Sequence, residues 1–203
     1  MGTGRESARR YLIAALTIAW SAMIASVAHG QAFSAAAVKA AFLHRFASYV
    51  EWPADVLGDR PFVIAVFDSE EVAMHLEGLL PGLAVQGRAA EVRRVAGVGD
   101  LDGVHILYIG PDAPARAREL RTAVATRPIL LVTDGEDGFA GGAIINFRES
   151  ANRVRFEVSL TAADRAGLRI DSALLPVAAR VERQPQAWLP YTRFFGLLAD
   201  QET

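Results

Sequence analysis

The sequence has no cysteine among its 203 residues. This absence excludes disulfide bonds, thiolate metal ligands and thiol redox switches. The folded state must therefore be stabilised by packing and by noncovalent polar contacts alone.

The familiar signatures of catalysis and of cofactor binding are also missing. The chain contains no GxxxxGK[ST], no GxSxG and no HExxH motif. Gly97-x-Gly99 precedes an expected strand rather than a helix, so it does not fit a dinucleotide-binding loop. None of the four histidines is spaced from another as a metal-binding pair; they are His29, His44, His75 and His105. We expect no enzymatic activity, cofactor or metal, and an unrecognised hydrolase is the weakest of the functions considered.

An acidic loop at residues 134–138 resembles a calcium site only superficially. A calcium-binding EF-hand loop that began at Asp134 would need Gly at its sixth position and Glu at its twelfth. Those positions hold Phe139 and Ile145. The loop is therefore interpreted as a solvated turn.

The chain has one long apolar stretch, and it lies at the N-terminus. Three arginines precede residues 11–27, which are almost wholly apolar, and small residues follow. This order predicts a secretory signal peptide over residues 1–30, cleaved between about Ala28 and Ala32. An uncleaved N-terminal anchor is the alternative. The segment after residue 30 has 18 basic and 22 acidic residues, a net charge of −4. It lacks the basic patch that a nucleic-acid partner would need, so we expect a periplasmic protein that binds no nucleic acid.

The segment 38–53, VKAAFLHRFASYVEWP, predicts an amphipathic helix. Its apolar arc contains Ala35, Val38, Phe42, Phe46, Tyr49 and Val50. Ser34 is the expected N-cap. Because Pro53 has no amide proton and restricts the residue before it, the helix should end near Glu51. Lys39 falls inside the apolar arc, where it either extends past the helix start to reach water or forms an ion pair inside the fold.

Apolar runs of strand length alternate with helical segments along the rest of the chain. The expected strands are 61–67, 88–95, 104–109, 129–132, 143–147 and 154–158, and the expected helices are 68–80, 113–125, a short one after 161, and 172–181. This order predicts an α/β fold, a single domain with a mostly parallel sheet flanked by helices. The short polar link at 146–152 predicts an antiparallel hairpin at one edge of the sheet.

The domain is expected to cover residues 34–181, and a C-terminal extension covers 182–203. In the extension, an apolar stripe at helical spacing consists of Tyr191, Phe194, Phe195 and Leu198. A helix this short needs a surface to pack on. We expect it to pack on its own domain; the alternative surfaces are a second copy and a membrane partner.

Three blocks of sequence, taken in this order, resemble the YfiR family of exported bacterial proteins. The blocks are the segment 38–53, the segment 129–147 with its Gly141-Gly142 pair, and the segment 154–175 with its Arg-Phe-Glu strand. The resemblance covers residues 38–181. It implies a compact periplasmic α/β domain that often self-associates, so a homodimer is left open.

The resemblance also implies a non-enzymatic regulator. Its partner would be the periplasmic sensor region of a membrane signalling protein, a diguanylate cyclase whose cyclic di-GMP synthesis it represses. A member of the family carries cysteines tied to redox behaviour, but this chain has none, so the resemblance implies no redox switch here. A periplasmic small-ligand binding module is the alternative function.

The motif residues of these blocks are expected to serve the fold rather than a partner: Lys39, Phe46, Trp52, Pro53, Gly141, Gly142 and Phe156. Arg155 and Glu157 are two residues apart and therefore share one face of a strand. They are the candidates for partner binding, together with Tyr191, Phe194, Phe195 and Leu198 of the C-terminal extension.

Overall fold

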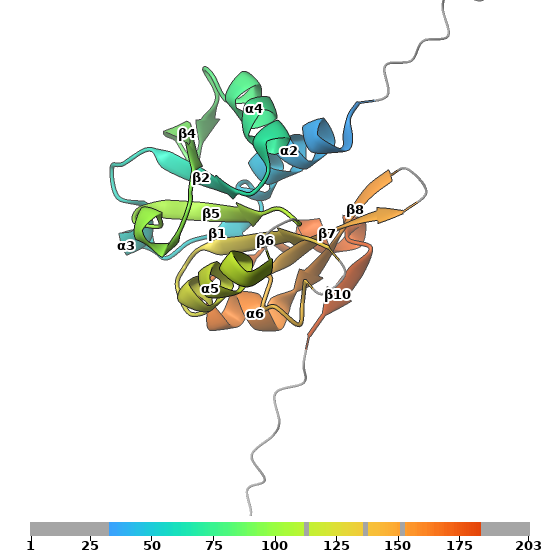
Figure 1. Ribbon diagram of the computed structural model, residues 1–203. Helices are drawn as coiled ribbons and strands as arrows, with labels where there is room; N and C mark the ends of the chain where they lie inside the picture. Colours follow the sequence, from blue (N-terminus) through green and yellow to red (C-terminus); the bar gives the residue numbers. More distant parts are fainter. Residues whose placement is uncertain (1–32, 112–113, 136–137, 151–152, 184–203) are drawn as a thin grey trace, which may run out of the picture. The chain divides into compact units, whose positions relative to one another are not determined.

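A computed structural model of the protein describes residues 33–111, 114–135, 138–150 and 153–183. A compact unit begins at Ala35. It contains an eight-stranded sheet and a separate two-stranded sheet, and helices pack on both faces of the larger one (Figure 1). The predicted α/β class with a mostly parallel sheet is confirmed.

The large sheet has the strand order β10-β8-β7-β6-β5-β2-β4-β3. Its strands, in chain order, are β2 (Phe62–Phe67), β3 (Ala84–Val85), β4 (Arg88–Arg94), β5 (Val104–Ile109), β6 (Leu130–Asp134), β7 (Ile145–Ser150), β8 (Arg153–Ser159) and β10 (Arg180–Glu182). The five central strands from β4 to β7 run parallel. Every residue of β2 and of β5 is buried. Both strands are continuous apolar runs because the sheet is covered on both faces there.

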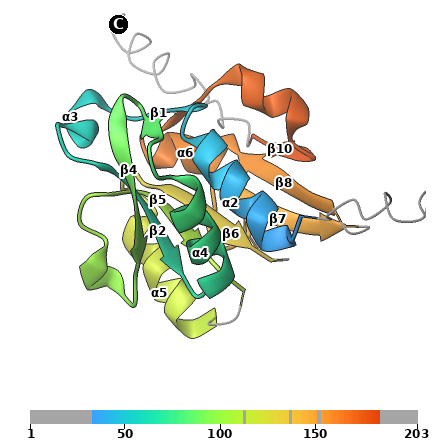
Figure 2. The same cartoon turned by 90° about the horizontal axis from the view of Figure 1, so that it is seen from above.

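Helices cover the two faces of the sheet unequally. The helices are α2 (Ala35–Phe46), α3 (Ala54–Leu57), α4 (Glu70–Leu79), α5 (Pro114–Val124) and α6 (Leu160–Arg165), with 3₁₀ turns η1 (Val98–Asp100) and η2 (Ser172–Val177). α2 and α4 contact each other and pack on one face, as the view from above shows (Figure 2). α5 packs on the opposite face. None of the helices in the described part of the chain combines the length and the apolar character that a membrane span needs.

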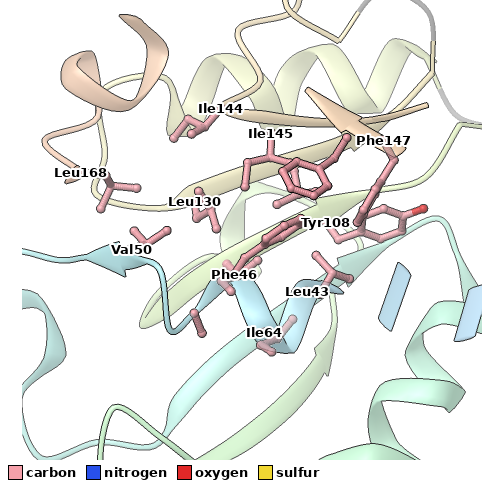
Figure 3. Packing of buried hydrophobic residues seen from close by; sticks show 14 of the residues in the cluster. Leu43, Phe46, Val50, Ile64, Tyr108, Leu130, Ile144, Ile145, Phe147 and Leu168 are labelled. Carbon is pink, nitrogen blue, oxygen red and sulfur yellow. The ribbon is translucent and has the colours of Figure 1, made fainter. Parts of the chain in front are cut away.

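The larger core lies between α2 and the sheet (Figure 3). Phe46 stacks on Phe147, with ring centroids 5.8 Å apart, and meets Phe156 edge-on at 5.0 Å. Tyr108 of β5 also meets Phe147 edge-on, with ring centroids 6.2 Å apart. These contacts join α2 to three strands that lie far from it in the sequence. Aromatic pairs of this kind stabilise a core by about 0.5–1.5 kcal/mol each beyond the area they bury.

The first helix is shorter than predicted. α2 ends at Phe46, and Val50 and Glu51 form the short strand β1. β1 pairs antiparallel with β9 (Arg169–Ile170) in the two-stranded sheet. The prediction that the helix continues to Glu51 was therefore wrong. Pro53 ends no helix here, because pairing with a strand more than a hundred residues away holds this segment extended.

The predicted hairpin is present, but it is not the last element of the sheet. β7 and β8 pair antiparallel over six residue pairs, from Ile145↔Val158 to Ser150↔Arg153. β10 lies outside β8 and pairs with it in parallel. The edge is therefore β10, formed by a segment that the sequence assigned to a helix.

The predicted core helix over 172–181 was wrong. The segment forms the 3₁₀ turn η2 with Pro176 inside it, and then the strand β10. Asp171 caps the turn by accepting from the amide of Ala173 at 2.8 Å. Since Pro176 donates no hydrogen bond and disfavours helical angles in the residue before it, the α-helix does not form.

Candidate functional site

A polar pocket lies at the carboxyl ends of the central parallel strands. The chain leaves β2 through α4 to β4 on one side, and it returns to β5 on the other side of β2. The connections therefore diverge between β2 and β5, and open α/β sheets bind their ligands at such a point. The loops after these two strands touch: a Cβ added to Gly110 would stand 2.0 Å from the carbonyl oxygen of Asp68.

The pocket has a volume of about 670 Å³. It is lined by the first turns of α2 and α4 and by the ends of β2, β4, β5 and β6. Among the described residues, seven charged side chains line it, five acidic and two basic: Asp68, Glu70, Glu71, Asp134, Glu149, Lys39 and Arg94. Both cations are already paired with carboxylates. Asp68 has a positive φ of 58°, which is uncommon for a residue with a side chain.

Lys39 forms the buried wall of the pocket. Its ammonium nitrogen Nζ lies 2.5 Å from Asp134 Oδ2 and 2.6 Å from Glu149 Oε1. The Tyr108 hydroxyl donates to the same Asp134 oxygen at 3.1 Å. The exposed fraction of the whole Lys39 residue is only 7 %. We name Lys39, Tyr108, Asp134 and Glu149 the Lys39 cluster. Of the two interpretations of Lys39, the ion pair inside the fold is confirmed.

The environment fixes the protonation states of Lys39 and Tyr108. Burial lowers the pKa of Lys39, but its hydrogen bonds to Asp134 and Glu149 outweigh burial and leave the pKa raised. Burial raises the pKa of Tyr108 far above its usual range, and the charge of Asp134 adds to the effect. Lys39 therefore stays charged and Tyr108 stays a hydrogen-bond donor at neutral pH.

Arg94 forms the exposed wall. Its guanidinium donates to Glu70 at 2.7 and 2.9 Å and also contacts Glu77. These hydrogen bonds lower the pKa of both glutamates. We name Arg94, Glu70 and Glu77 the Arg94 cluster. It joins the end of β4 to α4, two elements that follow each other closely in the sequence.

The described residues contain no group of three or more His, Cys, Asp or Glu side chains that could hold a metal ion. His105 is buried, and its ring nitrogen Nδ1 accepts from the amide of Val63 at 3.0 Å. Burial lowers the pKa of His105, in keeping with a neutral ring that serves the packing of β2 against β5.

The residues that were expected to serve the fold lie in the core or where the chain turns. Phe46, Phe156 and Trp52 are buried, and Trp52 meets Phe62 edge-on at 5.2 Å. Pro53 immediately precedes α3, and Gly142 has a φ of +81°, which favours glycine. A Cβ on Gly141 would stand 2.6 Å from the Arg121 side chain.

The two described candidates for partner binding do not line the pocket. Arg155 is exposed and Glu157 is half-buried, both on β8. Tyr191, Phe194, Phe195 and Leu198 lie outside the described residues, so their packing stays a prediction.

The sequence did not identify the Lys39 cluster. The interpretation of Asp134 as part of a solvated turn was wrong, because its side chain is only 12 % exposed and binds Lys39. The available signal was Lys39 itself, a cation in an apolar arc that required a buried carboxylate. Asp134 lies 95 residues away and Glu149 lies 110 residues away. No local pattern connects residues so far apart.

Comparison with known proteins gives one family. A family model described as YfiR/HmsC-like matches residues 36–179. Among solved structures, the chain is similar to a conserved domain protein from Vibrio cholerae O1 biovar El Tor, at 14 % identity and a TM-score of 0.49. The similarity covers 73 % of this chain and 60 % of that one, so this chain spans about three fifths of that protein's length. No curated protein matches the chain.

Proposed function

The chain belongs to the YfiR/HmsC-like family, and we propose that it is a periplasmic regulator that binds the extracytoplasmic region of a membrane signalling protein. The specific form of the proposal is a diguanylate cyclase partner, whose synthesis of cyclic di-GMP is repressed by the binding. The observation that carries it is the family match over residues 36–179, which covers almost the whole described fold. The first 30 residues, with the order of a secretory signal peptide, support export.

The direct test is deletion of the gene in its native host, with cyclic di-GMP measured by mass spectrometry. We expect the cyclic di-GMP level to rise, and a plasmid copy of the full chain to restore it. An unchanged level in the deletion strain would contradict repression of a cyclase. Cell fractionation with N-terminal sequencing tests the location, and an intact Met1 in the membrane fraction would contradict cleavage and release.

A small-ligand binding module is the second candidate function. The specific observation in its favour is the pocket of about 670 Å³ at the divergence point between β2 and β5. Its volume is within the range of about 300–1,000 Å³ that is usual for ligand sites. The test is a thermal-shift screen of charged metabolites against the full chain. A pocket ligand should raise the melting temperature of the wild type and fail to raise that of Asp68→Asn/Glu71→Gln.

A further inference from the structure

The pocket beside the Lys39 cluster carries more negative than positive charge. Among the described residues, five carboxylates and two cations line it, which leaves a net charge of −3. The starts of α2 and α4, two helices that lie side by side (Figure 2), also line the pocket. Each helix start contributes about half a positive charge, so the two together offset about one negative charge. The pocket therefore stays negative and favours a cation over an anion.

The two cations of the pocket are not available to an anionic ligand. Lys39 binds two carboxylates of its cluster, and Arg94 binds two carboxylates of its own. An anion would have to displace one of these carboxylates, and the displaced group would remain as an unpaired negative charge at the same site. The pocket is therefore a poor site for phosphate or for a carboxylic acid.

Two carboxylates of the pocket are free to bind a cation. Asp68 and Glu71 are exposed, and neither forms an ion pair with a described residue. The loop after β5 packs against Asp68, because a Cβ added to Gly110 would stand 2.0 Å from the Asp68 carbonyl oxygen. This contact fixes the position of Asp68 at the pocket. Glu71 lies in the first turn of α4.

A second part of the pocket wall is apolar. Ala36, Val66, Val72 and Val95 line the pocket, and all four are buried. An apolar wall binds methylene groups, because their removal from water is favourable. A hard metal ion takes oxygen ligands and gains nothing from such a wall. Free carboxylates beside an apolar wall therefore fit an organic cation with an aliphatic chain.

We propose that this pocket binds an aliphatic polyamine, a flexible chain with two or more ammonium groups. The ammonium groups donate charge-assisted hydrogen bonds to Asp68 and Glu71, and the methylene groups contact the apolar wall. The volume of about 670 Å³ is ample for such a chain. This inference rests on the second candidate function, small-ligand binding, and adds the chemical class of the ligand.

The first experiment is a calorimetric titration of the purified full chain with spermidine. The test variant is Asp68→Asn/Glu71→Gln. The matched control is Glu119→Gln/Asp164→Asn, which removes the same two charges at exposed positions of α5 and α6 outside the pocket. We expect the test variant to bind spermidine at least about tenfold more weakly than the control, a difference of about 1.4 kcal/mol. Equal affinity of the two variants, or no binding by the wild type, would overturn the proposal.

Two comparison ligands separate the contributions of charge and chain. Putrescine and 1,4-butanediol share a four-carbon chain, but only putrescine carries ammonium groups. We expect putrescine to bind and 1,4-butanediol not to bind. Mg²⁺ carries charge without a chain, so at equal concentration it should not displace spermidine beyond the effect of ionic strength. Displacement by equimolar Mg²⁺ would show a site that recognises charge alone and would overturn the polyamine.

A folding control accompanies the test variant. Asp68 has a positive φ, which Asn also adopts readily, so Asp68→Asn should leave the backbone unchanged. We expect the melting temperature of the test variant without spermidine to stay close to that of the wild type. Glu71→Gln alone gives a second measurement that does not involve the Asp68 backbone. It should also weaken spermidine binding, and an unchanged affinity would contradict the proposal.

The thermal-shift screen separates this proposal from the function on which it rests. If anionic metabolites raise the melting temperature and polyamines do not, the pocket binds ligands and the polyamine class is wrong. If no metabolite binds, small-ligand binding fails together with the polyamine. Neither result affects the proposed signalling partner, which the cyclic di-GMP measurement decides.

Discussion

Two cations line the same pocket, and each lies between two carboxylates, but their surroundings differ. The side chain of Lys39 is 9 % exposed and that of Arg94 is 44 % exposed. Lys39 connects α2 to β6 and β7, whereas Arg94 connects β4 to α4, which precedes it by about 20 residues. The difference teaches that equal numbers of ion pairs do not imply equal contributions to stability, because water can replace the partners of Arg94, whereas Lys39 and its partner Asp134 are both buried from water.

Removing the buried cation should have the largest effect. Lys39→Ala leaves Asp134 buried beside Tyr108 without its counter-charge, and breaking a buried pair in this way typically costs about 3–5 kcal/mol. We expect a loss of this size in the free energy of unfolding, measured by urea denaturation. The double variant Lys39→Met/Asp134→Asn should recover part of it, because it leaves no unpaired charge. Wild-type stability in Lys39→Ala would show that the two clusters are equivalent.

Trp52 provides an apolar reference for the buried cluster. Its side chain is buried against Phe62, and truncation of a buried Trp costs about 3–5 kcal/mol. We expect Trp52→Ala to lose this amount in denaturant melts with little dependence on salt. Trp52→Phe should lose less, since it keeps the ring contact. If Trp52→Ala melts like the wild type but no longer binds its partner, Trp52 is an interface residue instead.

The Lys39 cluster and the Arg94 cluster should affect the free energy of unfolding at opposite ends of the pH scale. The pKa values of Lys39 and Tyr108 are raised in the folded state, so their contribution to stability is fully present below about pH 10. This contribution is lost as the pH rises toward the pKa values of the two groups in the folded state. The lowered pKa values of Glu70 and Glu77 favour folding above about pH 4.5, and that contribution is lost as pH falls toward their folded values.

Melting temperatures across pH measure this difference. Lys39→Met should flatten the alkaline decline, while Arg94→Ala should flatten only the acid limb. A wild-type alkaline decline in Lys39→Met/Tyr108→Phe would show that other groups are responsible for it.

Arg94→Ala should have the smallest effect. The pairs of Arg94 lie at the surface, where solvent and salt screen them. We expect a small decrease in melting temperature at low salt that disappears at high salt. A large decrease that persists at high salt would place Arg94 with Lys39 as a structural cation, and the comparison between the two clusters would fail.

Prediction from the sequence succeeded where a signal is local. The continuous apolar runs of β2 and β5 predict buried parallel strands, and the structure confirms both. The short polar link at 146–152 predicts a hairpin, and β7 and β8 form one. Local signals failed at Val50–Glu51 and at 172–181, where pairing with β9 and with β8 decided the outcome.

The sequence by itself determined the class of the fold, its family, and the presence of a cation in the apolar arc of the first helix. Apolar periodicity and the order of the sequence blocks are properties of the sequence itself, so they can be recognised without the tertiary structure. Only the tertiary structure decided that Lys39 binds Asp134 and Glu149 and that a pocket opens beside it. The physical reason is that charges interact through space: the partners of Lys39 are 95 and 110 residues away, and only the folded sheet brings them within 3 Å.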